Sequence, residues 1–235
     1  AVDDVSFTLQ RGKTLALVGE SGCGKTTLGK ALLHLIPFNG GEVFLDGIAF
    51  HTLSSESLRQ ERAAMQIIFQ DPFSSMNPRL LVGDIIAEGL SALRPEMTAN
   101  EREMRVRKLL QRVELPEDAM YRYPHEFSGG QRQRICIARA LAVEPKVIIC
   151  DEPTSALDVS VQSQIIKLLK TLQEEQGMSY LFITHDLAVV SEIADEVAVM
   201  YRGKIVEQGA VAQILTQPQH TYTQKLLSAI PCAVA

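Results

Sequence analysis

Residues able to bind phosphate occur early in the chain, in the run Gly-Glu-Ser-Gly-Cys-Gly-Lys-Thr at positions 19–26. Glycines at this spacing let the backbone wrap closely around phosphate groups, because they adopt conformations closed to other residues. A short apolar run at residues 14–18 precedes the glycines, and a helical pattern at residues 25–35 follows them. We therefore expect a strand, a phosphate-binding loop and a helix whose N-terminus adds positive potential.

Individual loop residues can be assigned parts in binding a nucleotide. Lys25 is expected to contact the β- and γ-phosphates, and the hydroxyl of Thr26 to bind Mg²⁺. The other residues expected to surround the phosphates are Gly19, Ser21, Gly22, Cys23, Gly24 and Thr27. We interpret Cys23 as simply a small residue at a variable position. A chance glycine turn is the alternative, and the strand and helix patterns on either side argue against it.

Two adjacent acids end another apolar run. Residues 147–150 have the pattern of a buried strand, and Asp151 and Glu152 follow it. The carboxyl ends of strands are where α/β sheets bind ligands. Asp151 is expected to hold Mg²⁺ directly or through water, and Glu152 to act as general base toward the attacking water. A surface acid pair would explain neither the apolar run nor Pro153.

Single polar residues end two further strand patterns. His185 follows the pattern at residues 180–184, and Gln70 follows the one at residues 66–69. A lone histidine is more often structural than catalytic, and a lone glutamine carries little information. In company with a phosphate loop and an acid pair, both are expected in the catalytic site. There Gln70 would contact the metal and the water, and His185 would steady the phosphate.

A second anion-binding turn opens a helical pattern near the middle of the chain. It consists of Ser128, Gly129, Gly130 and Gln131. Its glycines and the helix N-terminus suit phosphate, but no lysine accompanies them. One phosphate loop together with a separate phosphate-capping turn suggests a site assembled from two copies.

The elements that position these residues follow from hydrophobic periodicity. Apolar strands alternating with helices predict a mostly parallel sheet covered on both faces. One such helix carries Val161, Ile165, Leu168 and Leu172 on one face. Hairpins are expected around Asp46-Gly47 and Arg202-Gly203. Residues from about 71 to 134 are mostly helical and polar, with Val106, Leu109, Leu110 and Val113 at helical spacing. This stretch is predicted to be an insertion into the sheet domain.

Composition limits the class of protein. The 235 residues are 46% hydrophobic, enough for a sizeable core, and a net charge of −5 gives no global field favouring nucleic acid or anionic membranes. Neither a signal peptide nor an apolar run of about 18 to 20 residues is present, so we expect a chain soluble by itself that docks on, or is fused to, a membrane protein. The cysteines Cys23, Cys136, Cys150 and Cys232 show no metal or redox spacing, and we expect reduced thiols in a cytoplasmic protein.

These motifs, in this order, resemble the ABC ATPase superfamily over essentially the whole chain. The matching features are the phosphate loop (Walker A), Gln70, the signature turn from Ser128, the Walker B acids Asp151 and Glu152, the D-loop Ser155-Ala156-Leu157-Asp158, and His185. The resemblance implies an α/β, RecA-like P-loop NTPase fold: a mostly parallel sheet with an antiparallel β subdomain and an inserted α-helical subdomain. It implies one domain over residues 1–235, with an ATP-binding core at about 1–70 and 140–218, a helical subdomain at about 71–139 and a C-terminal extension at 219–235.

The resemblance also implies a mechanism and partners. ATP and Mg²⁺ would be bound between two ATPase domains, in a homodimer, a heterodimer or a fused pair. Ser128 and Gly130 of one subunit would cap the γ-phosphate held by Lys25 of the other, with Asp158 also at the site. Transmembrane permease subunits, and indirectly a periplasmic or extracellular solute-binding protein, would be partners. Nucleic acid would not be one. The chain would lie peripherally on the cytoplasmic face of the inner (plasma) membrane.

Closer features are similar to ATPases of peptide, dipeptide and nickel importers, including the C-terminal halves of fused double ATPases. They are the segment at residues 69–79, Arg122-Tyr123-Pro124, and the segment at residues 220–227. Import of peptides or similar small solutes is therefore expected, although the cargo itself is chosen by other proteins. The family's adenine-stacking aromatic is expected upstream of this segment of a longer protein, with Phe7 a strand core residue. Cys232 alone cannot bind a cluster.

Two alternatives are weighed against transport. A non-transport ABC ATPase, of the DNA repair, chromosome or translation factor type, would carry a long coiled coil, zinc modules or a charged linker, and the sequence has none. A catalytically dead regulatory domain would not need Lys25, Asp151, Glu152 and His185 together.

Overall fold

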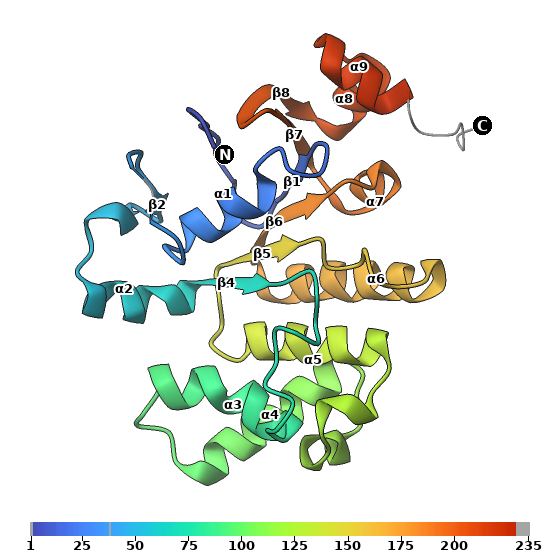
Figure 1. The fold of residues 1–235 in the computed structure, drawn as a ribbon. Coiled ribbons are helices and arrows are strands. Elements are labelled where there is room, and N and C mark those ends of the chain that lie inside the picture. Colours follow the sequence, from blue (N-terminus) through green and yellow to red (C-terminus); the bar gives the residue numbers. More distant parts are fainter. Residues whose placement is uncertain (1, 38, 229–235) are drawn as a thin grey trace.

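The computed structural model describes residues 2–37 and 39–228, and its centre is one six-stranded sheet (Figure 1). The strand order is β4-β5-β6-β1-β7-β8. These strands are β1 (Thr14–Val18), β4 (Met65–Ile68), β5 (Val147–Asp151), β6 (Ser179–Thr184), β7 (Glu196–Tyr201) and β8 (Lys204–Ala210). Neighbouring strands run parallel except for β7 and β8, which pair antiparallel. A small antiparallel sheet joins β2 (Phe44–Leu45) to β3 (Ile48–Ala49).

Helices cover both faces of the large sheet. They are α1 (Lys25–Leu32), α2 (Ser55–Glu61), α3 (Val82–Leu93), α4 (Ala99–Arg112), α5 (Gly129–Leu141), α6 (Val159–Gln176), α7 (Leu187–Ile193), α8 (Val211–Thr216) and α9 (Thr221–Ser228). Successive side chains of a strand point to opposite faces, and β1 follows this rule. Leu15 and Leu17 pack in the cluster that holds Leu28 of α1, whereas Ala16 and Val18 pack in the cluster that holds Val190 of α7.

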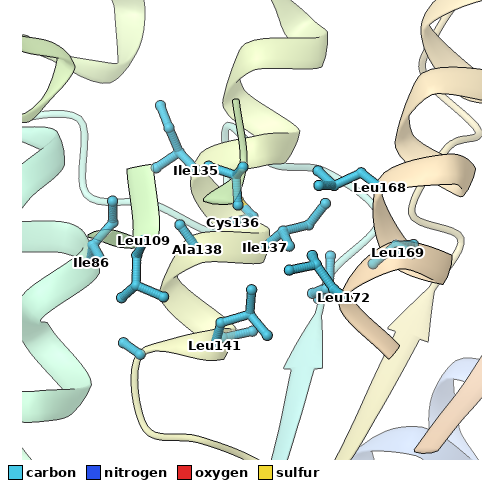
Figure 2. Packing of buried hydrophobic residues seen from close by; sticks show 14 of the residues in the cluster. Ile86, Leu109, Ile135, Cys136, Ile137, Ala138, Leu141, Leu168, Leu169 and Leu172 are labelled. Carbon is cyan, nitrogen blue, oxygen red and sulfur yellow. The ribbon is translucent and has the colours of Figure 1, made fainter. Parts of the chain in front are cut away.

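Helix α5 connects the helical segment to the sheet. Figure 2 shows its apolar residues between two groups, Ile86 and Leu109 from α3 and α4, and Leu168, Leu169 and Leu172 from α6. The same cluster continues to Ile148 and Phe182 of the sheet. In Figure 1 the helices α3, α4 and α5 lie below the β4 edge of the sheet, whereas α1 lies above it. The inserted helical segment is thus packed on the side of the molecule away from α1.

The fold class inferred from the sequence is confirmed, with small shifts of boundaries. Both hairpins form around Asp46-Gly47 and Arg202-Gly203. Helix α1 ends at Leu32 rather than Leu35, and His34 follows with a φ of 52° that a helix cannot continue.

The placement of Phe7 in a strand is wrong. Val5, Phe7 and Leu9 alternate against the α1 side of the core, and all three are half-buried. A strand also needs a hydrogen-bonded neighbour, and none of the described residues provides one to this segment.

Three of the four cysteines of the sequence lie among the described residues. Cys23, Cys136 and Cys150 are buried free thiols. Cys232, and with it residues 229–235 of the expected C-terminal extension, lies outside the described residues. Within the described part of the chain, the helices are too short or too polar to cross a bilayer.

Candidate active site

The residues singled out in the sequence meet at one edge of the sheet because four neighbouring strands run parallel and in register. Val18 of β1 lies opposite Thr184 of β6. Asp151 of β5 lies opposite Ile183, and Ile68 of β4 lies opposite Cys150. The phosphate loop, Gln70, Glu152 and His185 each follow the end of one of these strands and Asp151 ends β5, so they emerge at the same edge.

The phosphate loop depends on backbone freedom at its first glycine. Gly19 has a φ of 154°, and a Cβ atom there would clash with the carbonyl oxygen of Met200. Gly24, at the N-cap of α1, has a φ of 115° and leads directly into the helix. Ser21 and Gly22 are exposed at the tip of the loop, and Thr27 is half-buried in the first turn of α1. The loop therefore presents its tip and a helix N-terminus on the same side.

Lys25 is folded back into the loop. Its Nζ donates hydrogen bonds to the carbonyl oxygens of Gly19, at 2.7 Å, and Glu20, at 3.0 Å. The sulfur of Cys23 is 3.8 Å from the same Nζ. The side chain is buried, and the partners that hold its ammonium are backbone carbonyl groups rather than a carboxylate. This leaves its positive charge available to an anion.

Thr26 and Asp151 bring two oxygen ligands together. The Oγ1 of Thr26 donates to Oδ1 of Asp151 at 2.9 Å, across 125 positions of sequence. Burial raises the pKa of Asp151 above its ordinary value, although the hydrogen bond from Thr26 opposes this. A carboxylate that is costly to leave charged gains stability from a cation beside it. A hydroxyl and a carboxylate are also the oxygen donors that Mg²⁺ prefers, so the pair fits that ion.

Glu152 is the centre of a polar triad. The amide Nε2 of Gln70 donates to its Oε2 at 3.0 Å, and Nδ1 of His185 lies 3.3 Å from its Oε1. The backbone of Glu152 has a φ of 47°, which non-glycine residues seldom adopt, and its N–H donates to the carbonyl of Ile183. The glutamate is mostly buried, at 16% exposure, whereas His185 is 60% exposed.

The turn at Ser128 forms a capped helix start. Ser128 Oγ accepts a hydrogen bond from the N–H of Gln131, and the Gln131 side chain accepts one from the N–H of Ser128. This reciprocal capping fixes the N-terminus of α5. Ser128, Gly129 and Gln131 are exposed, and a Cβ atom on Gly130 would clash with Val161 of α6.

Asp158 caps the neighbouring helix α6. Its Oδ1 accepts hydrogen bonds from the N–H of Val161, at 3.0 Å, and from the hydroxyl of Ser160, at 2.7 Å. These bonds lower the pKa of Asp158, so the carboxylate is ionised at neutral pH. A Cβ atom on Gly129 would reach ordinary contact with Leu157, directly before Asp158. The two helix starts therefore lie side by side.

The structure does not bring the Ser128 turn to the phosphate loop of the same chain. Ser128 begins α5, which packs beside β4, whereas Lys25 begins α1 after β1. Two strands, β5 and β6, separate β4 from β1. The first turn of α1 still reaches Asp151 of β5, but α1 packs with Ile149 on one face of the sheet and α5 packs with Ile148 on the other. One chain therefore holds two separate glycine-flanked helix N-termini.

One residue near the loop was not singled out from the sequence. The hydroxyl of Tyr222, on α9, accepts a hydrogen bond of 3.0 Å from the N–H of Glu20. Tyr222 belongs to the segment at residues 220–227 that resembles importer ATPases, and no role was assigned to it. Its aromatic type and late position gave no signal of a contact 202 positions earlier.

Comparisons with known proteins identify the family of the chain. The sequence model of a family described as "ABC transporter" matches residues 2–155. The oligopeptide transport ATP-binding protein OppF of Bacillus subtilis strain 168 is 53% identical over 232 residues, which are 98% of this chain and 76% of OppF. The glutathione import ATP-binding protein GsiA of Pectobacterium atrosepticum is 54% identical over 99% of this chain, which spans 37% of GsiA.

Solved structures give the same result. CbiO1 of Clostridium perfringens, part of the ABC transporter complex cbiONQ, is similar with a TM-score of 0.81 and 30% identity, over 92% of this chain and 84% of that one. The ATP-binding cassette MJ0796, a dimer in a post-hydrolysis state with ADP and Pi, is similar with a TM-score of 0.80 and 31% identity, over 89% and 90% of the two chains.

Proposed function

The chain belongs to the ABC transporter family of ATP-binding proteins, and we propose on this premise that it powers the import of peptides or similar small solutes by hydrolysing ATP. The observation that carries the proposal is the meeting of Lys25, the Thr26–Asp151 pair and the Glu152 triad at one edge of the sheet. This arrangement combines phosphate binding, two oxygen ligands for a cation and a carboxylate able to take a proton.

The phosphate loop binds the ATP phosphates. Its amides and the N-terminus of α1 surround them, through Gly19, Ser21, Gly22, Cys23, Gly24 and Thr27. Lys25 needs no large rearrangement to meet the β- and γ-phosphates, because carbonyl groups already hold its ammonium at the loop. Thr26 and Asp151, together with Gln70, would hold Mg²⁺, which supplies charge neutralisation at the phosphates.

Glu152 takes the proton of the attacking water. Its carboxylate is held from two sides, by the Gln70 amide and the His185 ring, so its orientation is set before substrate arrives. Gln70 and His185 thus position the base, and His185 is exposed enough to contact the γ-phosphate as well. Preorganised donors of this kind contribute because they need not reorient during the reaction.

A second copy or a related ATPase domain completes the site. Ser128, Gly129, Gly130 and Gln131 of one domain, with Asp158 beside them, face the γ-phosphate held on the other. The separation of the two helix N-termini within one chain supports this arrangement. Permease subunits in the membrane, and a solute-binding protein outside it, are the further partners. The chain acts at the cytoplasmic face of the membrane.

Peptide import is favoured over the other reading of an ABC ATPase, a DNA repair or translation factor. OppF and GsiA are transport proteins by name, and they match this chain over nearly all of its length. The test is a deletion of the gene in its native host, followed by uptake measurements with labelled peptides of two to five residues. Peptide uptake should be lost and then restored by the wild-type gene but not by a Lys25→Ala allele. Unchanged peptide uptake in the deletion strain would contradict the proposed cargo.

A further inference from the structure

Helix α9 reaches the phosphate loop through the hydroxyl group of Tyr222. Tyr222 is 7% exposed, and its Oη accepts a hydrogen bond of 3.0 Å from the N–H of Glu20. Its ring stacks on Tyr201, the last residue of β7, with ring centroids 4.2 Å apart and an angle of 30° between the rings. The hydroxyl is thus held in place by an aromatic contact and aimed at the loop backbone.

Glu20 is the residue on which the loop's internal bonds converge. Its carbonyl oxygen accepts from Nζ of Lys25 at 3.0 Å and from the N–H of Cys23 at 3.3 Å. The amide hydrogen-bonded to Tyr222 and this carbonyl belong to the same residue. The N–H of Glu20 also shares a planar peptide bond with the carbonyl of Gly19, which accepts from Nζ of Lys25 at 2.7 Å, so fixing this N–H restrains a carbonyl that holds the lysine.

The turn after β7 supports the loop from the same side. The N–H of Gly203 donates to the carbonyl of Cys23 at 3.0 Å. Tyr201, which stacks on Tyr222, lies two positions before Gly203. The N–H of Glu20 and the carbonyl of Cys23 are therefore hydrogen-bonded to Tyr222 and to the turn after β7, and these two partners are joined by the stacked rings.

Helix α9 is itself fixed to the sheet. The carboxylate of Glu207, on β8, accepts hydrogen bonds from the N–H groups of Gln219, at 2.8 Å, and His220, at 3.0 Å. The Nδ1 of His220 accepts from the N–H of Tyr222 at 3.1 Å. A continuous path of hydrogen bonds therefore runs from Glu207 through the start of α9 to the phosphate loop.

We propose that Tyr222 is a positioning residue of the nucleotide site, through which α9 holds the phosphate loop in its binding conformation. The proposal rests on the proposed function, because it assumes that this loop binds the phosphates of ATP. Tyr222 acts through Glu20 and Lys25 and does not itself touch the nucleotide. Because such coupling is reciprocal, bound nucleotide also tightens the docking of α9.

Tyr222→Phe is the direct test, because it removes the hydroxyl and keeps the ring that stacks on Tyr201. Loss of one hydrogen bond leaves the binding conformation of the loop only partly populated, and apparent affinity falls by that fraction. The dissociation constant for MgATP, measured with a fluorescent ATP analogue, should rise about 3- to 10-fold. The kcat should stay within about twofold of the wild type, because the triad around Glu152 is untouched.

Tyr201→Phe is the matched control. It alters the same aromatic stack, and the Tyr201 hydroxyl makes no hydrogen bond to any residue that the structure describes. Its dissociation constant should equal that of the wild type. An equal rise in both variants would attribute the effect to stacking alone and overturn the proposal.

A measurement without nucleotide separates this proposal from the proposed function. The thiol of Cys23 is buried in the loop, at 8% exposure, and loosening of the loop exposes it. In nucleotide-free Tyr222→Phe, alkylation of Cys23 by iodoacetamide, followed by peptide mass spectrometry, should be several-fold faster than in the wild type. Cys136 and Cys150, buried elsewhere, report any general unfolding and should stay slow.

The outcomes are distinct. Wild-type protein that fails to bind MgATP contradicts the proposed function, whatever the alkylation rates. Wild-type affinity together with a wild-type Cys23 rate in Tyr222→Phe overturns the role of Tyr222 and leaves the proposed function standing. Glu207→Gln, which weakens the anchor of α9 without touching the loop, should shift both readouts in the same direction by a smaller factor.

Discussion

The side-chain amide of Gln70 donates a 3.0 Å hydrogen bond to Oε2 of Glu152, although 82 positions separate the two residues in the chain. Gln70 follows β4 and Glu152 follows β5, and these strands are neighbours in the sheet. Gln70 also begins the segment that leads into the helical insertion. A movement of this segment would therefore shift the amide that orients the proposed base.

Glu152→Gln should abolish turnover and keep binding. The amide fills the same space but takes no proton, so ATP hydrolysis should fall by at least about 100-fold. The dissociation constant for MgATP should change little, because the phosphate loop is intact. Phosphate release and fluorescent-nucleotide binding measure the two effects. Glu174→Gln, at an exposed position of α6, is the control and should behave as the wild type. A variant at position 152 that hydrolyses ATP at the wild-type rate excludes Glu152 as the base.

Thr26→Val should change the metal requirement. The substitution keeps the shape of the side chain but removes the hydroxyl that lies 2.9 Å from Asp151. The Mg²⁺ concentration for half-maximal ATPase activity should rise on the order of tenfold, the scale seen when a group supporting a bound metal is removed. Titration of Mg²⁺ at saturating ATP measures it. Unchanged Mg²⁺ dependence would remove Thr26 from the metal site.

Gly129→Ala and Gly130→Ala should have different effects on stability. Both residues lie at the start of α5, where alanine is favoured over glycine by up to about 1 kcal/mol. At Gly129 an added Cβ makes ordinary contact with Leu157 at 3.5 Å, so the free energy of unfolding should rise slightly or stay unchanged. At Gly130 the Cβ clashes with Val161, whose β-branched side chain has little rotamer freedom in a helix.

For Gly130→Ala the free energy of unfolding should fall by about 1 to 3 kcal/mol, the usual cost of overpacking. Urea denaturation of both variants beside the wild type measures the difference. Equal stability of the two alanine variants would show that α5 and α6 separate easily at this point.

The edge of the sheet at which the candidate site residues gather was predictable, because it depends on local patterns of the sequence. Apolar runs at residues 14–18 and 147–150 indicate strands, and parallel pairing then brings the residues after them together. Two features depend on the whole fold and left no local pattern. One is the φ of 47° at Glu152, whose N–H bonds to the carbonyl of Ile183, and the other is the bond from Glu20 to Tyr222, 202 positions apart. The strand prediction for Phe7 was wrong because Val5, Phe7 and Leu9 alternate as in a strand and are partly buried, but they pair with no neighbouring strand among the described residues.

The last prediction tests whether the ATP site is shared between two copies. Ser128 starts α5 and Lys25 starts α1, and the two helices pack on opposite faces of the sheet, so one copy cannot present both residues to one γ-phosphate without rearrangement. The similar cassette with ADP and Pi is dimeric. Lys25→Ala and Ser128→Arg should each inactivate a preparation in which the wild-type chain hydrolyses ATP.

Mixing the two inactive variants should restore activity, because a mixed dimer carries one site with both Lys25 and Ser128 intact. Random pairing makes half of the dimers mixed, so the recovered rate should be about a quarter of the wild-type rate. The wild-type rate should also rise more than linearly with protein concentration, as followed by light scattering beside the ATPase assay. A mixture that stays inactive, together with a specific activity that remains high at dilutions where the chain is monomeric, would require each chain to hold a complete site of its own.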